Sequence, residues 1–168
     1  MANENMRTSA TGLTALRQRE HAVFRYYNDA ANNCTYGVGT LAHHGPCAEE
    51  ELRRPVSIAD VEAQLAMRVR TAEAAVRRRV RTHPLTQDQF DALVSFTFNA
   101  GATGAQQTLD AANRGVAGEV ARHLNNNVYV HPRDANGRRL APVRLQGLVN
   151  RRREEAVPFQ TPASQAGR

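Results

Sequence analysis

Residues 20–40 read EHAVFRYYNDAANNCTYGVGT, and this stretch decides the fold. Aromatic and β-branched residues occupy 23–27, small polar residues follow, and a second apolar run covers 35–41. Runs of this kind, separated by a turn rich in Asn and Asp, predict two short strands. We therefore expect a small β-hairpin, or three short strands, directly after a first helix at 11–21 that Thr11 caps.

Three polar residues lie at the borders of these elements. Eight residues separate Glu20 from Asp29, and five separate Asp29 from Thr35. Glu20 has apolar neighbours, and partial burial favours a protonated carboxyl group, whereas Asp29 lies among asparagines and should stay ionised. Two carboxyl groups in unlike surroundings, with a hydroxyl that orients water, suit glycoside hydrolysis. The alternative is that all three are ordinary surface residues.

The composition is that of a globular protein with one domain. Of the 168 residues, 41% are hydrophobic and 23% are charged, so the chain can bury a sizeable core. No apolar run has the length of a membrane span. The first residues, MANENMRTSATG, lack the basic and apolar segments of a secretory signal, so another protein must carry the chain if it acts outside the cytoplasm.

The net charge of +6 restricts the candidate partners. A basic protein attracts nucleic acid, an anionic membrane or an acidic cell-wall polymer, although a solvated basic face can also serve solubility alone. Trp is absent and aromatic residues are only 5% of the chain, which argues against stacking on nucleic-acid bases.

Two long helices are predicted in the middle of the chain. The first begins at an N-cap, Ser57, carries an apolar stripe opposite an arginine-rich face, and ends at His83-Pro84. At roughly 40 Å it could join two lobes. The second begins at Thr86 with a capping box and ends near Gly101. Shorter helices are expected at 104–113, 115–125 and 147–157, an irregular segment at 42–56, and a ribbon at 128–145 with a turn at Asn136-Gly137.

Cys34 and Cys47 are the two cysteines. His43 and His44 lie between them, so a lone metal site is one alternative, but the spacing is not that of a zinc finger and no metal is predicted. A disulfide would close a short loop and stabilise the fold by about 3 kcal/mol in the loop-entropy model. The alternative is two reduced, buried thiols.

Three blocks of sequence resemble glycoside hydrolase family 24, the phage-type lysozymes. They are the Glu–x8–Asp–x5–Thr spacing followed by TYGVGT, the segment LTQDQFDALVSFTFNAG (85–101), and the segment GLVNRRREEAVPF (147–159). The blocks occur in the family's order. This resemblance implies an α+β lysozyme-like domain over 11–159, with its site in the cleft between two lobes.

The resemblance also divides the chain. The small lobe should cover about 20–56, and the helical lobe about 57–159 together with the helix at 11–21. Residues 1–10 would form a flexible N-terminus and residues 160–168 a disordered tail.

The family's roles carry over at matching positions. Glu20 would protonate the glycosidic oxygen, while Asp29 would hold the attacking water and Thr35 would orient it. Family members cut the β-1,4 bond between N-acetylmuramic acid and N-acetylglucosamine in peptidoglycan without a cofactor or metal. Asn99, Gly39 and Arg151 are the candidates for substrate contacts. Arg151 falls where the family has an arginine near the catalytic Glu, and a cation there would favour ionised Glu20, so burial must oppose it.

The chain departs from the family pattern in three places. His21 replaces a glycine after the catalytic Glu, and the insertion at 128–145 is unusual. Thr40 follows Gly39 without the family's usual histidine, so His43 or His44 could take that place, or no residue does. These changes affect the expected pH profile and outer substrate contacts more than the bond that is cleaved.

The partners follow from the resemblance. We expect a monomer that binds peptidoglycan strands and not nucleic acid, with weak contact to anionic membranes as a further candidate. It would be made in the cytoplasm and act in the periplasm or cell wall. One setting is a phage endolysin released through a holin. The other is the lysozyme module of an antibacterial effector delivered by a secretion machine, and an immunity protein is then a further partner. The competing hypothesis is a wall-binding module without turnover.

Overall fold

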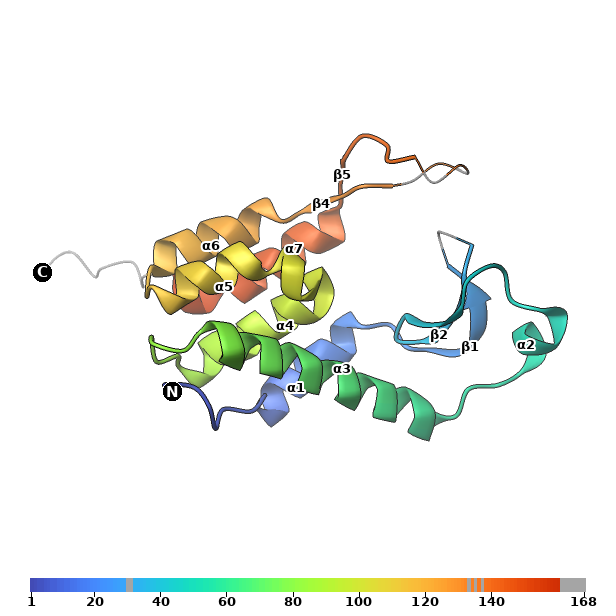
Figure 1. Cartoon of the computed structure of the whole chain (residues 1–168), viewed down its shortest axis with the longest axis horizontal. Coiled ribbons are helices and arrows are strands. Elements are labelled where there is room, and N and C mark those ends of the chain that lie inside the picture. The colour runs from blue at the N-terminus through green and yellow to red at the C-terminus, as the bar shows by residue number, and fades with distance from the viewer. Residues whose placement is uncertain (30–31, 133, 135, 137, 161–168) are drawn as a thin grey trace, which may run out of the picture.

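The computed structural model (Figure 1) describes residues 1–29, 32–132, 134, 136 and 138–160. Its elements in chain order are α1 (Ala10–Arg19), β1 (Val23–Asn28), β2 (Cys34–Gly37), β3 (Thr40–His43), α2 (Glu49–Arg53), α3 (Ile58–Arg79), α4 (Gln87–Gly104), α5 (Gln106–Asn113), α6 (Ala117–Asn126), β4 (Tyr129–Val130), β5 (Val143–Arg144), α7 (Gln146–Ala156) and the 3₁₀ turn η1 (Val157–Phe159). The α+β class is confirmed, with a small lobe around β1–β3 and a larger helical lobe, and α3 runs from one into the other (Figure 1).

The small lobe contains an antiparallel sheet in the order β1-β2-β3. The prediction of a single strand over 35–41 is wrong, because the chain turns between β2 and β3. Gly37 and Gly39 have φ values of +63° and +79°, which only glycine adopts without strain. The segment 42–56 is also more regular than expected, because β3 extends to His43 and α2 covers Glu49–Arg53.

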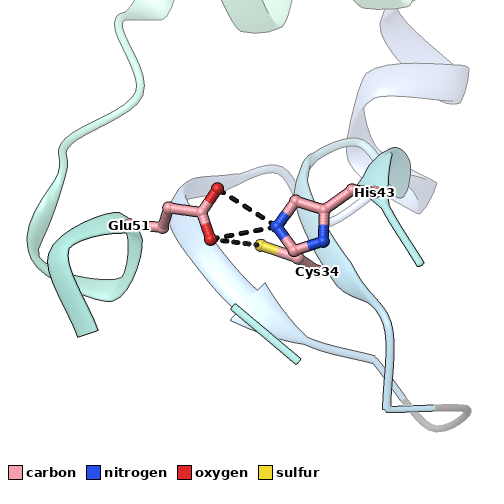
Figure 2. A group of neighbouring side chains, drawn as sticks. All are labelled: Cys34, His43 and Glu51. Carbon is pink, nitrogen blue, oxygen red and sulfur yellow. Dashed lines mark hydrogen bonds and ion pairs between the residues drawn. The ribbon is translucent and has the colours of Figure 1, made fainter. Parts of the chain in front are cut away.

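Glu51 connects the short helix α2 to the sheet through His43 and Cys34 (Figure 2). His43 of β3 lies 3.0 Å from Glu51 of α2, measured from Nε2 to Oε2. The same carboxylate oxygen accepts a hydrogen bond from the Ala48 N–H at 2.7 Å. The side chain of Glu51 therefore has a fixed position beside β2 and β3.

The long helix α3 begins as predicted and ends early. The Ser57 hydroxyl accepts a hydrogen bond from the Asp60 N–H and confirms the predicted N-cap. The helix has 22 residues, which is about 33 Å, and it ends at Arg79 instead of at His83-Pro84. Its apolar stripe is buried, and Val76 is fully covered.

Helix α4 is the core helix of the larger lobe. Thr86 and Gln89 form the predicted capping box, and Phe90, Leu93 and Phe96 are completely buried. The predicted end lies at a real break, because Gly101 has a φ of +75° and leaves the helical conformation, although a last turn continues to Gly104.

One arginine connects the two lobes. The Arg68 guanidinium, on α3, donates to the Val38 carbonyl in the turn between β2 and β3. Its central carbon also lies 4.2 Å from the centre of the Phe98 ring on α4, a cation–π distance. Arg68 therefore holds the β2–β3 turn against the helical lobe.

The N-terminal segment is fixed to the helical lobe, contrary to the expectation of a flexible segment at 1–10. Asn3 is 1% exposed, and its side-chain amide donates to the carbonyls of Val80 and His83 at 2.8 and 2.9 Å. Its carbonyl accepts from the Leu85 N–H at 2.9 Å. One asparagine thereby satisfies three backbone groups after α3, where the helix has ended.

The start of α1 also differs from the prediction. The helix begins at Ala10, and its N-cap is Ser9, whose hydroxyl accepts from the Gly12 N–H, in place of Thr11. Just before it, the N–H and hydroxyl of Thr8 both donate to Glu73 at 2.8 Å. Burial by itself raises the pKa of Glu73, but the hydrogen bonds from Thr8 and Arg77 outweigh it and hold the pKa below its usual value.

The C-terminal region follows the predicted order of elements. The ribbon at 128–145 is antiparallel, with Tyr129 opposite Arg144 and Val130 opposite Val143. Gly137 of the predicted turn and residues 161–168 of the predicted tail lie outside the described residues. Within the described part of the chain, no helix combines the length and the apolar character that membrane crossing requires.

Candidate active site

Glu20 lies at the C-terminal end of α1, where its N–H donates to the Leu16 carbonyl at 2.9 Å. Arg151 of α7 donates from Nη1 to Oε1 of Glu20 at 2.8 Å. The side chains of Glu20 and Arg151 are 19% and 10% exposed, so water screens this ion pair only in part. The carboxyl group of Glu20 consequently has a fixed position at the end of α1.

Arg151 is itself fixed by the helical lobe. Its Nε donates to Glu155 at 3.0 Å, and its Nη2 donates to the Ser95 carbonyl at 3.0 Å. Because the guanidinium is planar, three hydrogen bonds in different directions define its orientation. Glu20 is therefore positioned through Arg151 by α4 and α7.

A buried carboxylate lies behind this arginine. Glu155 is 1% exposed and accepts from the Ser95 hydroxyl at 2.6 Å and from Arg152 Nη1 at 2.7 Å. Burial lowers the pKa of Arg152, and the Glu155 carboxylate opposes this shift. The buried positions of Arg152 and Glu155 were not predicted, because the run RRREE resembles a solvated helix face, although Arg151 and Glu155 have the four-residue spacing of a helical ion pair.

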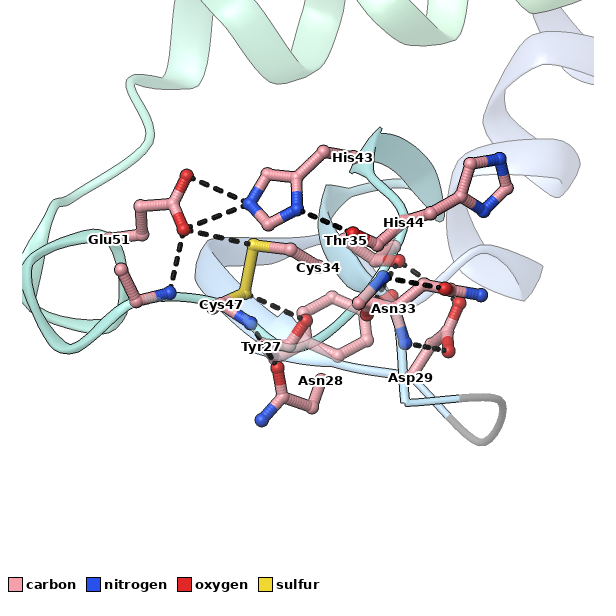
Figure 3. The surroundings of a disulfide bond; sticks show 12 residues. Tyr27, Asn28, Asp29, Asn33, Cys34, Thr35, His43, His44, Cys47 and Glu51 are labelled. Atoms are coloured by element: carbon pink, nitrogen blue, oxygen red, sulfur yellow. Dashed lines mark hydrogen bonds and ion pairs between the residues drawn. A yellow bond between two sulfur atoms is a disulfide. The ribbon is translucent and has the colours of Figure 1, made fainter. Parts of the chain in front are cut away.

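Asp29 and Thr35 meet in the small lobe, directly after β1 and within β2 (Figure 3). The Thr35 hydroxyl donates to Oδ2 of Asp29 at 3.1 Å, and the Asn33 N–H donates to Oδ1 at 2.9 Å. The Asp29 N–H returns a hydrogen bond to the Asn33 carbonyl at 2.9 Å. Thr35 is only 4% exposed, so its hydroxyl is held in place by the sheet around it.

A disulfide between Cys34 and Cys47 borders this turn (Figure 3). The predicted bridge is confirmed, and the alternative of two reduced thiols is wrong. Cys34 stands between Asn33 and Thr35, which both donate to the Asp29 carboxylate, and Cys47 stands just before α2. The bridge therefore ties the turn that carries Asp29 to the neighbouring chain segment.

His43, which lies beside the disulfide, contacts the His44 carbonyl and the Glu51 carboxylate. The hydrogen bond between His43 Nδ1 and the His44 carbonyl, at 3.0 Å, and the nearby Glu51 carboxylate raise the pKa of His43. The same contact with His43 lowers the pKa of Glu51. His43 is thus directed at α2, and the Thr40 hydroxyl donates to Gln64 at 2.9 Å.

The other two candidates lie on the surface. Asn99 is exposed near the break in α4, and its side-chain carbonyl accepts from Arg152, which leaves the amide NH₂ directed elsewhere. Gly39 is exposed in the turn between β2 and β3. A side chain at Gly39 would meet an Arg68 nitrogen at 3.8 Å, and its positive φ would strain any other residue.

The candidate residues thus form two groups at the two ends of β1. Glu20 and Arg151 belong to the group fixed by the helical lobe, and Asp29 and Thr35 to the group fixed by the small lobe. Strand β1 connects them in the sequence. In each group, charge or hydrogen-bond partners define the position of one carboxyl group.

The chain is similar to known proteins over most of its length. The family model "Phage lysozyme" matches residues 17–155. The chain is 33% identical to the SAR-endolysin of Escherichia phage Mu over 138 residues, which are 81% of this chain and 71% of that protein.

Two solved structures share the fold over nearly the whole chain. The endolysin of Escherichia coli O157:H7 phage FAHEc1 is 30% identical with a TM-score of 0.72, and the match covers 92% of this chain and 94% of that one. The muramidase domain of SpmX from Asticaccaulis excentricus is 29% identical with a TM-score of 0.72, covering 94% and 100%. Because the family model matches more than half of the chain, including Glu20, Asp29 and the core helix, the chain belongs to the phage lysozyme family.

Proposed function

We propose that this member of the phage lysozyme family, a glycosidase-type hydrolase that acts on peptidoglycan, cleaves the β-1,4 bond between N-acetylmuramic acid and N-acetylglucosamine. The observation that carries the proposal is the contact between the Thr35 hydroxyl and Asp29, because it leaves that hydroxyl oriented beside an anionic carboxylate. Glu20 supplies the second carboxyl group on the other end of β1.

Asp29 and Thr35 act on the attacking water. A threonine hydroxyl has one hydrogen to donate and two lone pairs that accept. Since the hydrogen is used on Asp29, the lone pairs remain to accept a hydrogen bond from water. Asp29 accepts the other proton of that water as its oxygen bonds to the anomeric carbon of the muramic acid residue.

Glu20 acts on the leaving sugar. Its proton passes to the glycosidic oxygen as the bond to the anomeric carbon breaks, so the departing N-acetylglucosamine leaves as a neutral alcohol. Arg151 is a positioning residue, because it fixes the Glu20 carboxyl group from behind through Ser95 and Glu155. Glu20 loses one proton and Asp29 gains one, so exchange of protons with solvent returns both carboxyl groups to their starting states.

The polymer is proposed to bind across both groups. Asn99 offers an exposed amide whose carbonyl is already bound to Arg152, so its NH₂ can donate to a sugar oxygen. Gly39 allows close approach of the glycan to the backbone, because it carries no side chain. The net charge of +6 draws the protein to a wall rich in carboxylates, more strongly at low salt.

In the cell, the enzyme would reach its substrate after leaving the cytoplasm where it is made. Release as an endolysin and delivery as the catalytic module of an antibacterial effector both fit the chemistry. An immunity protein is a partner only in the second setting.

The test is digestion of purified, protein-free peptidoglycan with two parallel assays. We expect new reducing sugar ends to appear in proportion to the fall in turbidity, with no new free amino groups. New amino groups without reducing ends would indicate cleavage of the peptides and contradict the proposal. Binding to the wall without either product would support the competing wall-binding module.

Replacement of Thr35 with valine keeps the shape of the side chain and removes its hydroxyl. We expect the initial rate of lysis to fall by about 100-fold, the order found when one oriented hydrogen-bonding group is removed from a site. Thr35→Ser keeps the hydroxyl and should stay within about tenfold of the parent. Equal rates for the parent and Thr35→Val would show that the hydroxyl does not orient the water.

A further inference from the structure

Among the described residues, three side chains outside the catalytic chemistry gather as ligands of a metal ion do (Figure 2). One ligand atom each from Cys34, His43 and Glu51 lie within 4.8 Å of one another. Cys47 Sγ is bonded to Cys34 Sγ and adds a fourth. In the oxidised chain the sulfurs are a disulfide, and zinc binds thiolates, so the cluster becomes a ligand set only after reduction.

We propose that the reduced chain binds one Zn²⁺ through Cys34, Cys47, His43 and Glu51, and that this ion replaces the disulfide as the cross-link of the small lobe. Reduction by two equivalents of a thiol converts the disulfide into two cysteine thiols and oxidises the reductant to its own disulfide. Binding of Zn²⁺ to the two thiols releases two protons.

The distances fit a tetrahedral ion. With bonds of about 2.0–2.3 Å to nitrogen, oxygen and sulfur, neighbouring ligand atoms in a tetrahedron are about 3.3–3.8 Å apart. The structure gives 3.8 Å between Glu51 Oε2 and Cys34 Sγ, at the upper end of this range. His43 Nε2 and Glu51 Oε2 are 3.0 Å apart and must move slightly apart when an ion binds. After reduction the two sulfurs must separate to a similar spacing, which rotation of the two cysteine side chains allows.

The orientation of the ligands supports zinc more specifically. A zinc-bound histidine uses one ring nitrogen for the metal, and its other nitrogen usually donates to a carbonyl or carboxylate. His43 has this arrangement, because Nδ1 contacts the His44 carbonyl at 3.0 Å while Nε2 faces Glu51. Glu51 is oriented in turn by the Ala48 N–H.

The cluster is also open to solvent on one side. The side chains of His43 and Glu51 are 44% and 22% exposed, so an ion can enter there, whereas Cys34 is fully buried on the inner side. The sequence places His43 between the two cysteines, but Glu51 comes from α2 and joins them only through the fold. The site adjoins Asn33 and Thr35, so the cross-link would keep the turn that carries Asp29 in place under reducing conditions.

The experiment uses the whole chain, reduced without oxygen by a phosphine and then freed of reductant. Co²⁺ serves as the spectroscopic probe, and Zn²⁺ is then added to displace it. We expect one Co²⁺ per chain, with the thiolate-to-cobalt absorption and strong visible bands of a tetrahedral site, and stoichiometric displacement by Zn²⁺. The oxidised chain should show none of these bands.

Three variants decide which residues bind. His43→Ala and Glu51→Gln should each weaken Zn²⁺ binding by at least about tenfold, the lower end of the effect of disturbing the shell around a bound metal. His44→Ala is the matched control, because His44 contributes only its backbone carbonyl, and its affinity should equal that of the parent. Absence of the cobalt bands in the reduced parent, or equal affinities for all three variants, would overturn the site.

A second measurement tests whether Zn²⁺ restores structure that the chain loses on reduction. If the reduced chain loses part of its circular dichroism signal, Zn²⁺ is expected to restore it in the parent and in His44→Ala but not in His43→Ala. A reduced parent that remains unfolded with one equivalent of Zn²⁺ would contradict the proposal.

Discussion

Glu20→Gln should abolish lysis of peptidoglycan while leaving the fold intact. The amide has the shape of the carboxyl group and can still accept the hydrogen bond from Arg151, so the end of α1 keeps its anchor. It has no acidic proton for the glycosidic oxygen, and loss of a general acid lowers the rate by about 10²- to 10⁴-fold. The measurement is the initial rate of turbidity loss on purified peptidoglycan, with circular dichroism as the check on folding.

Glu62→Gln is the matched control for this substitution. Glu62 pairs with Arg17 at 2.6 Å, as Glu20 pairs with Arg151, but its side chain is 47% exposed and it lies on α3. We expect the control to lyse at the parent rate. A folded Glu20→Gln protein that also lyses at the parent rate would remove Glu20 from the catalytic chemistry.

Glu155→Gln should cause the largest loss of stability among these substitutions. Its carboxylate accepts hydrogen bonds from Ser95, Arg151 and Arg152 in a site that is closed to water. An amide there would point its own NH₂ at one of these donors and leave the buried Arg152 without its counter-charge. Removing one partner of a buried ion pair costs about 3–5 kcal/mol, and we expect a loss in this range in the free energy of unfolding.

The measurement is urea unfolding of the oxidised protein. Glu154→Gln is the control, because that neighbouring side chain is 64% exposed in its pair with Arg19, and surface substitutions usually change stability by less than about 0.5 kcal/mol. If Glu155→Gln and Glu154→Gln unfold at the same urea concentration, the buried network does not stabilise the fold as described.

The elements that the sequence predicted well are those determined by local chemistry. Ser57 and Thr86 begin helices because their hydroxyl groups satisfy free N–H groups close by in the chain. The apolar stripes of α3 and α4 repeat with helical spacing, so their burial followed directly. The disulfide was predicted as one of two alternatives, and the pairing of Cys34 with Cys47 resolves it.

The parts that escaped prediction depend on contacts between distant segments. Asn3 is buried because it satisfies backbone groups around residue 80, and nothing near Asn3 in the sequence indicates this. Arg152 and Glu155 lie in a run of charged residues, and only the position of α7 against α4 shows that they face inward. Of the candidate site, the resemblance placed Asp29 and Thr35 on the same water, but neither their direct hydrogen bond nor the fixation of Arg151 by Ser95 was inferred.

The bond and the role of water can be tested together in one product analysis. Peptidoglycan digested to completion is treated with borohydride, and the soluble fragments are identified by mass spectrometry. If water held by Asp29 and Thr35 attacks the muramic acid carbon, every fragment should end in reduced N-acetylmuramic acid. Fragments that end in 1,6-anhydro-muramic acid, which forms without water, or in reduced N-acetylglucosamine would contradict the proposed reaction.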